Sequence, residues 1–174
     1  MDLVLDSFLT ALKLIFTGDR EVFSITGRTL LISGTSTTIA ALIFIPVGSL
    51  IYFHTFPGKG VLISVIQTLF STPTVFVGLL VFLTFSKEGP LGSFGILFSP
   101  QAIIIGHIFL IAPIMAGLTI SALRGVAPEI KDTALSLGAS RVQTIYTVVK
   151  EAKYGVSTAV VLGFGRAISE IGLA

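Results

Sequence analysis

Residues 102–123 read AIIIGHIFLIAPIMAGLTISAL, and no side chain in this stretch is charged. The stretch lies within a longer uncharged run at 89–123, and two similar runs, 29–58 and 60–86, precede it. A helix needs about 20 apolar residues to cross a hydrocarbon core about 30 Å thick. Each run therefore predicts one membrane-spanning helix with its flanks, and none is long enough for two.

The composition of the whole chain also predicts a membrane protein. Of its 174 residues 53% are hydrophobic and 11% are charged, with a mean hydropathy of +0.99, whereas soluble domains carry about 25% charged residues. The net charge of +2 is too small for a nucleic-acid-binding surface. We therefore expect the lipid bilayer, and no nucleic acid, as a partner. The absence of cysteine removes disulfides and thiolate chemistry.

We predict an all-α fold, a polytopic transmembrane helix bundle that forms a single domain over residues 1–174. Small and hydroxyl side chains in the first predicted span allow close helix packing, and Pro73 and Pro113 interrupt the next two. Arg166 and Glu170 lie inside the fourth, so the bundle interior is expected to be partly polar. The predicted spans lie near residues 29–53, 61–85, 102–123 and 156–174.

Two further features concern topology. Residues 1–17 alternate apolar and charged side chains in the pattern of an amphipathic helix lying in the membrane interface, with a short tilted span as the weaker alternative. Five Lys and Arg residues fall between 124 and 153, whereas the 86–101 connection has only Lys87. The positive-inside rule therefore places 124–155 in the cytoplasm. The 17–28 segment is then outside, although it carries two arginines.

The 124–155 segment has its own helical signals. Pro128 suits a first helical turn, and Gly138 suits the position after a last turn. Ser140 and Gln143 have the spacing of a capping box that begins a second helix. A short surface helix with an apolar stripe is typical of a docking element.

A family pattern follows from these residues. Asp132, Thr133 and Ala134, then Gly138, then Val148 fall at the intervals of an E-A-A, three residues, G, nine residues, I-x-L-P motif, although Lys150 and Glu151 stand where Leu and Pro are usual. The chain thus resembles the permeases of binding-protein-dependent ABC importers. Segments at 56–59, 72–79, 89–92 and 165–172 resemble the molybdate/tungstate branch, and 18–22 the tungstate type.

The resemblance implies a function and its partners. It implies a multi-pass subunit of a prokaryotic-type cell membrane that pairs with a second copy of itself to form the pore for an oxyanion, tungstate foremost. An extracytoplasmic binding protein would deliver the anion, and separate ATP-binding cassette subunits would hydrolyse ATP, so no cofactor is expected on this chain. One further helix is expected after residue 174. The residues that would couple the pore to the ATPase are Asp132, Thr133, Ala134, Gly138 and Val148.

The substrate path is predicted from polar residues in the spans. Arg166 and Glu170 are four residues apart, so Arg166 attracts an anion or, on the favoured reading, the two form a salt bridge that fixes packing. Ser169 beside them is a candidate neutral donor. The hydroxyls at 33–38 and those of Ser71, Thr72 and Thr74 are candidate anion donors as well, with bonding to their own helix as the favoured alternative.

Alternative functions remain at this stage. The sequence contains no P-loop, G-x-S-x-G or H-E-x-x-H pattern, so the chain itself is not expected to be an enzyme. An intramembrane enzyme using His107, Arg166 and Glu170 is one rival, although His107 is better explained as a packing residue. The other rivals are a permease for molybdate or sulfate and a membrane scaffold that does not transport.

Overall fold

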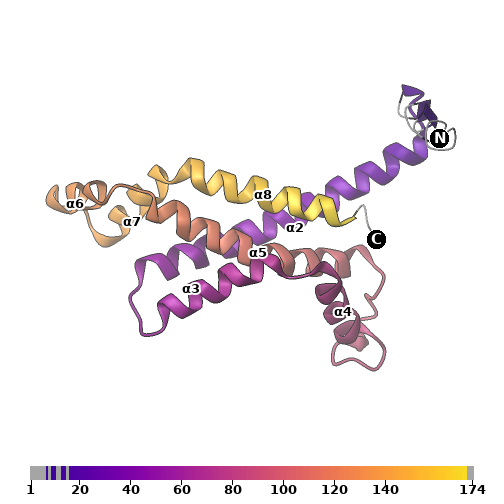
Figure 1. The fold of residues 1–174 in the computed structure, drawn as a ribbon, viewed down its shortest axis with the longest axis horizontal. Coiled ribbons are helices and arrows are strands. Elements are labelled where there is room, and N and C mark those ends of the chain that lie inside the picture. The colour runs from indigo at the N-terminus through magenta and orange to yellow at the C-terminus, as the bar shows by residue number, and fades with distance from the viewer. Residues whose placement is uncertain (1–6, 8, 11–12, 15, 172–174) are drawn as a thin grey trace.

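The computed structural model describes residues 7, 9–10, 13–14 and 16–171, and all regular structure among them is helical. The all-α prediction is therefore confirmed. The helix predicted over 1–17 and the end of the span predicted over 156–174 fall partly outside the described residues. In chain order the elements are α2 (Arg20–Phe53), α3 (Lys59–Thr68), η1 (Leu69–Ser71), α4 (Thr74–Phe85), η2 (Gly92–Phe94), α5 (Pro100–Arg124), α6 (Pro128–Ser136), α7 (Arg141–Glu151) and α8 (Lys153–Ile171) (Figure 1).

Helix α2 begins earlier than the apolar pattern predicts. The Asp19 carboxylate accepts the backbone N–H groups of Glu21 at 3.0 Å and Val22 at 3.1 Å, which caps the helix at its N-terminus. Its 34 residues make a helix about 51 Å long, well beyond the thickness of a hydrocarbon core. The charged first turns therefore lengthen a span that the sequence placed at 29–53.

The second predicted span, 61–85, consists of two helical segments, so the prediction of one continuous helix is wrong. The helical segment Lys59–Ser71 and the helix Thr74–Phe85 meet at 97°. Thr72 and Pro73 are both extended at the break, with ψ of 125° and 134°, because proline disfavours helical backbone in the residue before it. The pair is a broken span or a re-entrant loop.

Fewer helices are long and apolar enough to cross a membrane than the four predicted spans. Within the described residues α2 and α5 are long and apolar enough to cross a membrane, and the bent pair makes a third if it counts as one span. Helix α8 does not qualify, and it carries Lys153, Arg166 and Glu170.

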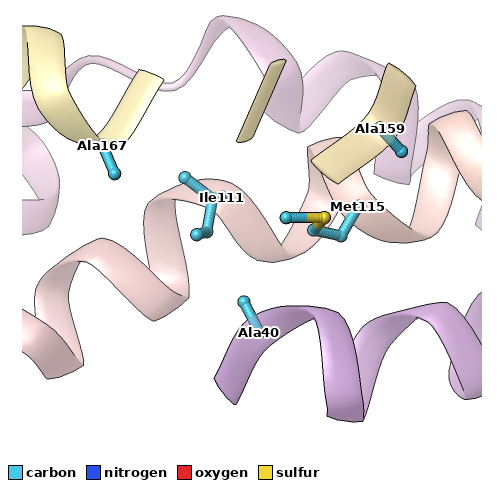
Figure 2. Close-up of a cluster of buried hydrophobic side chains, with 5 residues drawn as sticks. All are labelled: Ala40, Ile111, Met115, Ala159 and Ala167. Atoms are coloured by element: carbon cyan, nitrogen blue, oxygen red, sulfur yellow. The ribbon is translucent and has the colours of Figure 1, made fainter. Parts of the chain in front are cut away.

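The core is built around α5. Figure 2 shows Ile111 and Met115 of α5 lying between Ala40 of α2 and Ala159 and Ala167 of α8, and all five side chains are fully buried. Alanine on the outer helices allows their backbones to approach α5, whose larger side chains fill the space. Half of the most apolar window of α5 is buried, against 22% of that of α2, so α5 is the central helix.

The two ends of the bundle separate the connections. In Figure 1 α6 and α7 lie at the same end as the turn between α2 and α3, and the connection from α4 to α5 lies toward the other end with the start of α2. Segment 54–58 and segment 125–152 are thus on one side. That this side is the cytoplasmic one stays a prediction from the Lys and Arg count.

Candidate functional site

The first candidate site is the hairpin of α6 and α7. Helix α6 begins at Pro128 and its last residue is Ser136. The Gly138 N–H donates to the Leu135 carbonyl and the Ala139 N–H to the Ala134 carbonyl, both at 3.0 Å, the hydrogen-bond pattern of a Schellman motif. Gly138 has a φ of +83°, a conformation that a residue with a Cβ adopts only with strain. The predicted helix end at Gly138 is confirmed.

Helix α7 begins with the predicted capping box. The Ser140 hydroxyl accepts the Gln143 N–H at 3.4 Å, and the Ser140 N–H donates to the Gln143 side-chain oxygen at 2.7 Å. This reciprocal pair satisfies two donors at the start of the helix. Two short helices with a defined turn between them therefore form a rigid unit.

The hairpin is attached to the bundle through one face of α7. Val148 is 2% exposed and packs in a buried cluster with Leu123 of α5 and Ala152 before α8. Tyr52 and Phe53 at the end of α2 pack against the same cluster. Val148, predicted to couple to an ATPase, therefore holds the hairpin on the bundle and offers little surface to a partner.

The opposite surface of the hairpin is open. Asp132, Thr133 and Gly138 are exposed and Ala134 is half-buried. Apolar side chains flank the turn, where Leu137 is 83%, Val142 75% and Tyr146 68% exposed. All three line one shallow groove together with Gln143 and Thr147. Leu137 and Thr147 also line a second groove, with Ile130, Thr133 and Ala134.

Val142 and Tyr146 also belong to this surface, although they are not among the coupling residues predicted from the sequence. Thr144 and Val148 are the buried residues of α7, so residues on the other side of a helix must face outward. The large apolar side chains on that outer face were the signal in the sequence for such a surface. Because exposed apolar patches on the surface of a protein mark interaction sites, the open face of the hairpin is suited to docking.

The second candidate site is the charged pair on α8. The Arg166 Nη2 and Glu170 Oε1 atoms are 3.1 Å apart, with side chains 35% and 12% exposed. The Nε of Arg166 is buried and has no hydrogen-bond partner. The Ser169 hydroxyl donates to the Arg166 carbonyl at 2.8 Å, so it is engaged with its own helix. The predicted pairing of Arg166 with Glu170 is present.

One cavity brings three of the polar residues together. Thr74 of α4, His107 of α5 and Glu170 of α8 line a space of about 440 Å³ whose other walls are mostly Val, Leu and Phe. Thr72 lines a different cavity and donates its hydroxyl to the Leu69 carbonyl at 2.8 Å. Ser71 is exposed at the end of η1. The hydroxyls of 71–74 therefore do not form one cluster.

The hydroxyls of α2 divide into two kinds. Ser36 and Thr38 donate to the carbonyls of Ile32 and Gly34, four residues earlier, at 2.7 and 2.8 Å, as the favoured alternative predicted. Ser33 and Thr37 are buried and their hydroxyls have no hydrogen-bond partner. Across the described part of the chain no three His, Asp or Glu side chains converge as metal ligands.

A helical bundle with membrane-length helices, a partly buried charged pair and a two-helix hairpin with exposed apolar side chains at one end defines a polytopic membrane protein. Residues 44–174 match the family model described as "Binding-protein-dependent transport system inner membrane component". This chain belongs to that family of membrane transport components.

Curated relatives extend the match to most of the chain. It is 38% identical over 149 residues to a probable anion ABC transporter permease protein of Haloferax volcanii, covering 86% of this chain and 64% of the relative. It is 36% identical to the tungstate uptake system permease protein TupB of Peptoclostridium acidaminophilum, covering 99% and 75% of the two chains. The Campylobacter jejuni TupB is 33% identical, covering 100% and 73%. The chain therefore spans between about two thirds and three quarters of these relatives.

Proposed function

We propose that this chain is the membrane-spanning permease subunit of an ATP-driven importer that carries an oxyanion, with tungstate as the principal substrate. The names of two relatives, which are tungstate uptake permeases covered over nearly the whole of this chain, support the substrate. The family match supports the role as the membrane component. A separate ATPase and an extracytoplasmic binding protein are the partners in this proposal.

The observation that carries the proposal is the construction of the α6–α7 hairpin. Its turn is held by the Schellman motif at Gly138, its outer surface exposes Leu137 and Tyr146, and Val148 packs directly on the end of α5. A force applied to the open face is transmitted to α5 and α8 through packed side chains rather than through a loose linker. That is the arrangement a docked ATPase needs in order to favour one state of the bundle over another.

The exposed face of α8 supports a role for this helix in the passage. Large apolar side chains on α2 and α4, such as Leu31, Leu42 and Val75, are 71, 72 and 84% exposed, as suits a surface that faces lipid. The exposed face of α8 interleaves Val161 and Leu162 with polar or small residues, namely Ser157, Thr158, Gly165 and Ser169. Polar and charged groups inside a membrane face a bundle interior or water. We therefore place α8 as the fourth span, facing a passage completed by a second copy of the chain.

The proposal is tested by reconstituting the permease with its ATPase and binding protein in vesicles and measuring uptake of radiolabelled tungstate with and without ATP. The wild-type complex is expected to accumulate tungstate only with ATP. Asp132→Lys, which reverses a charge on the open face of α6, is expected to lower uptake at least tenfold while ATP hydrolysis continues. Glu151→Lys, the same reversal at the far end of α7, is the matched control and is expected to behave as wild type.

The outcomes separate the remaining functions. Accumulation of molybdate or sulfate in preference to tungstate would keep the importer and change the substrate. A complex that binds an ATPase but accumulates none of the three anions would favour the scaffold and contradict the proposal. Normal uptake by Asp132→Lys would remove the hairpin from the coupling path.

A further inference from the structure

His107 is a buried polar residue that the proposed function leaves unused. Its side chain is 7% exposed, and its Nδ1 has no hydrogen-bond partner. A buried polar group without a partner is costly and is rare in folded proteins. The His107 Nδ1 is therefore free to take a partner in another conformation.

The packing of α8 on α5 identifies that partner. A Cβ on Gly155 would lie 2.6 Å from the Ala122 Cβ, and one on Gly163 would lie 2.5 Å from the Met115 Cε. The two helices are therefore antiparallel, and continuing along both by about two turns brings Glu170 level with His107. The two side chains also line the same cavity. The Glu170 carboxylate is thus within the reach of both Arg166 and the imidazole.

The present pairing leaves Arg166 unsuited to bind an anion. The Glu170 carboxylate at 3.1 Å neutralises the guanidinium, and a neutralised cation attracts a dianion weakly. Arg166 nevertheless keeps a third of its side chain exposed and an unpaired Nε. A guanidinium has five N–H donors in a fork that suits oxyanions, so its capacity to bind one is present but covered.

We propose that Glu170 exchanges between Arg166 and His107, and that this exchange uncovers Arg166 as the anion-binding group of the passage. The inference rests on the proposed function, because it assigns the group that meets the transported oxyanion. His107 acts through Glu170 and is therefore a positioning residue.

The exchange leaves none of Arg166, Glu170 and His107 as an unpaired buried charge. His107 takes a proton from the bulk solution through water in the passage, and the imidazolium then donates to the Glu170 carboxylate, while the oxyanion takes the place of that carboxylate on Arg166. When the anion leaves, Glu170 returns to Arg166 and His107 releases the proton. A carboxylate that simply left Arg166 would be an unpaired buried charge, which is strongly unfavourable.

Few other groups are able to supply the proton or the charge. At the level of His107, α8 contributes Glu170 and Arg166. Helix α4 contributes Thr74 and Val77 to the cavity, and α2 contributes Ser36 and Thr37, because Ala40 packs with Ile111 one turn further on. Neither α2 nor α4 presents a titratable group there among the residues described. Because histidine is the side chain that ordinarily changes charge between pH 5 and 8, anion binding is expected to tighten as the pH falls through that range.

The test is equilibrium binding of micromolar radiolabelled tungstate to the detergent-solubilised permease–ATPase complex, without binding protein, at pH 6 and pH 8. The wild type is expected to bind about tenfold more tightly at pH 6, a coupling of ordinary size. His107→Gln is expected to show one weak Kd at both pH values. Glu170→Gln is expected to show one tight Kd at both, and the double variant is expected to match Glu170→Gln.

Controls and contrary outcomes complete the design. Thr119→Val, which changes another buried side chain of α5, is expected to keep the wild-type Kd at both pH values, and His107→Asn replaces His107→Gln if the latter does not assemble. Three results would each overturn the exchange. The first is a wild-type Kd that is equal at both pH values, and the second is a pH dependence that survives in the His107 variants. The third is Glu170→Gln binding tungstate no more tightly than the wild type at pH 8. ATP-driven uptake by the wild type is measured separately, so a failure of the proposed function is distinguishable from a failure of this inference.

Discussion

Helices α5 and α8 pack side by side and differ in how apolar each one is. Helix α5 has 25 residues, and its most apolar 18-residue stretch has a mean hydropathy of 2.3 and is half buried. Helix α8 has 19 residues, carries a charged pair, and does not reach the apolarity of a span on its own. Apolarity alone does not tell a protein-buried helix from a lipid-facing one, because both environments accept the same side chains. Polar side chains are the more informative signal, because they are stable only against protein or water and not against lipid.

The largest effect is expected where a new side chain would meet the backbone of α5. A Cβ on Gly48 of α2 would lie 2.7 Å from the Ala116 carbonyl oxygen, and this is a backbone atom. Gly48→Leu is therefore expected to separate α2 from α5 and prevent recovery of an assembled permease, as measured by size-exclusion chromatography in detergent. Gly34→Leu, in the same helix with open space around it, is the matched control and is expected to assemble.

The second effect tests whether the polarity of α8 serves transport or packing. In the double variant Arg166→Leu with Glu170→Leu, ATP-driven tungstate uptake is expected to fall at least tenfold because the proposed anion-binding group is lost. Replacing a buried ion pair by apolar residues is often neutral or stabilising by about 1–4 kcal/mol, so the thermal midpoint is expected to be unchanged or higher. A lower midpoint together with normal uptake would show that the pair serves packing alone.

A smaller effect is expected where α8 meets a flexible side chain of α5. A Cβ on Gly163 would meet the Met115 Cε at 2.5 Å, the far end of an adaptable thioether chain. Gly163→Ala is expected to cost less than about 1 kcal/mol of stability, whereas Gly48→Ala is expected to cost about 1–3 kcal/mol by overpacking. Thermal unfolding of the two variants measures the difference, and equal costs would contradict the distinction between side-chain and backbone obstacles.

The smallest effect concerns a polar group on α5. The Thr119 hydroxyl is fully buried with no hydrogen-bond partner, so its removal loses no bond. Thr119→Val is expected to leave uptake unchanged and to shift stability by less than about 1 kcal/mol, toward greater stability. A large loss of uptake would place a functional polar group on α5 and weaken the contrast with α8.

Local signals in the sequence predicted the hairpin well. Pro128, Gly138 and the Ser140–Gln143 capping box act within a few residues of themselves, so their geometry does not depend on the rest of the fold. The sequence shows that Pro73 interrupts the second apolar stretch, but it does not predict the 97° angle between the two helices. Neighbouring helices decide whether a proline kinks a span or ends it. The early start of α2 was hidden behind its charged first turns, although Asp19 was the available cap.

The sequence by itself determined that this protein is helical, that long uncharged stretches are apolar enough to cross a membrane and that a capped two-helix hairpin follows α5, because partition into lipid and helix capping depend on the residues in place. Only the tertiary structure decided that α5 is the centre, that Val148 anchors the hairpin and that Glu170 shares a cavity with His107. These facts depend on which helix faces which. An apolar stripe accepts lipid and protein equally, so the choice is made by the small residues, such as Ala40 and Ala167, that allow two backbones to approach.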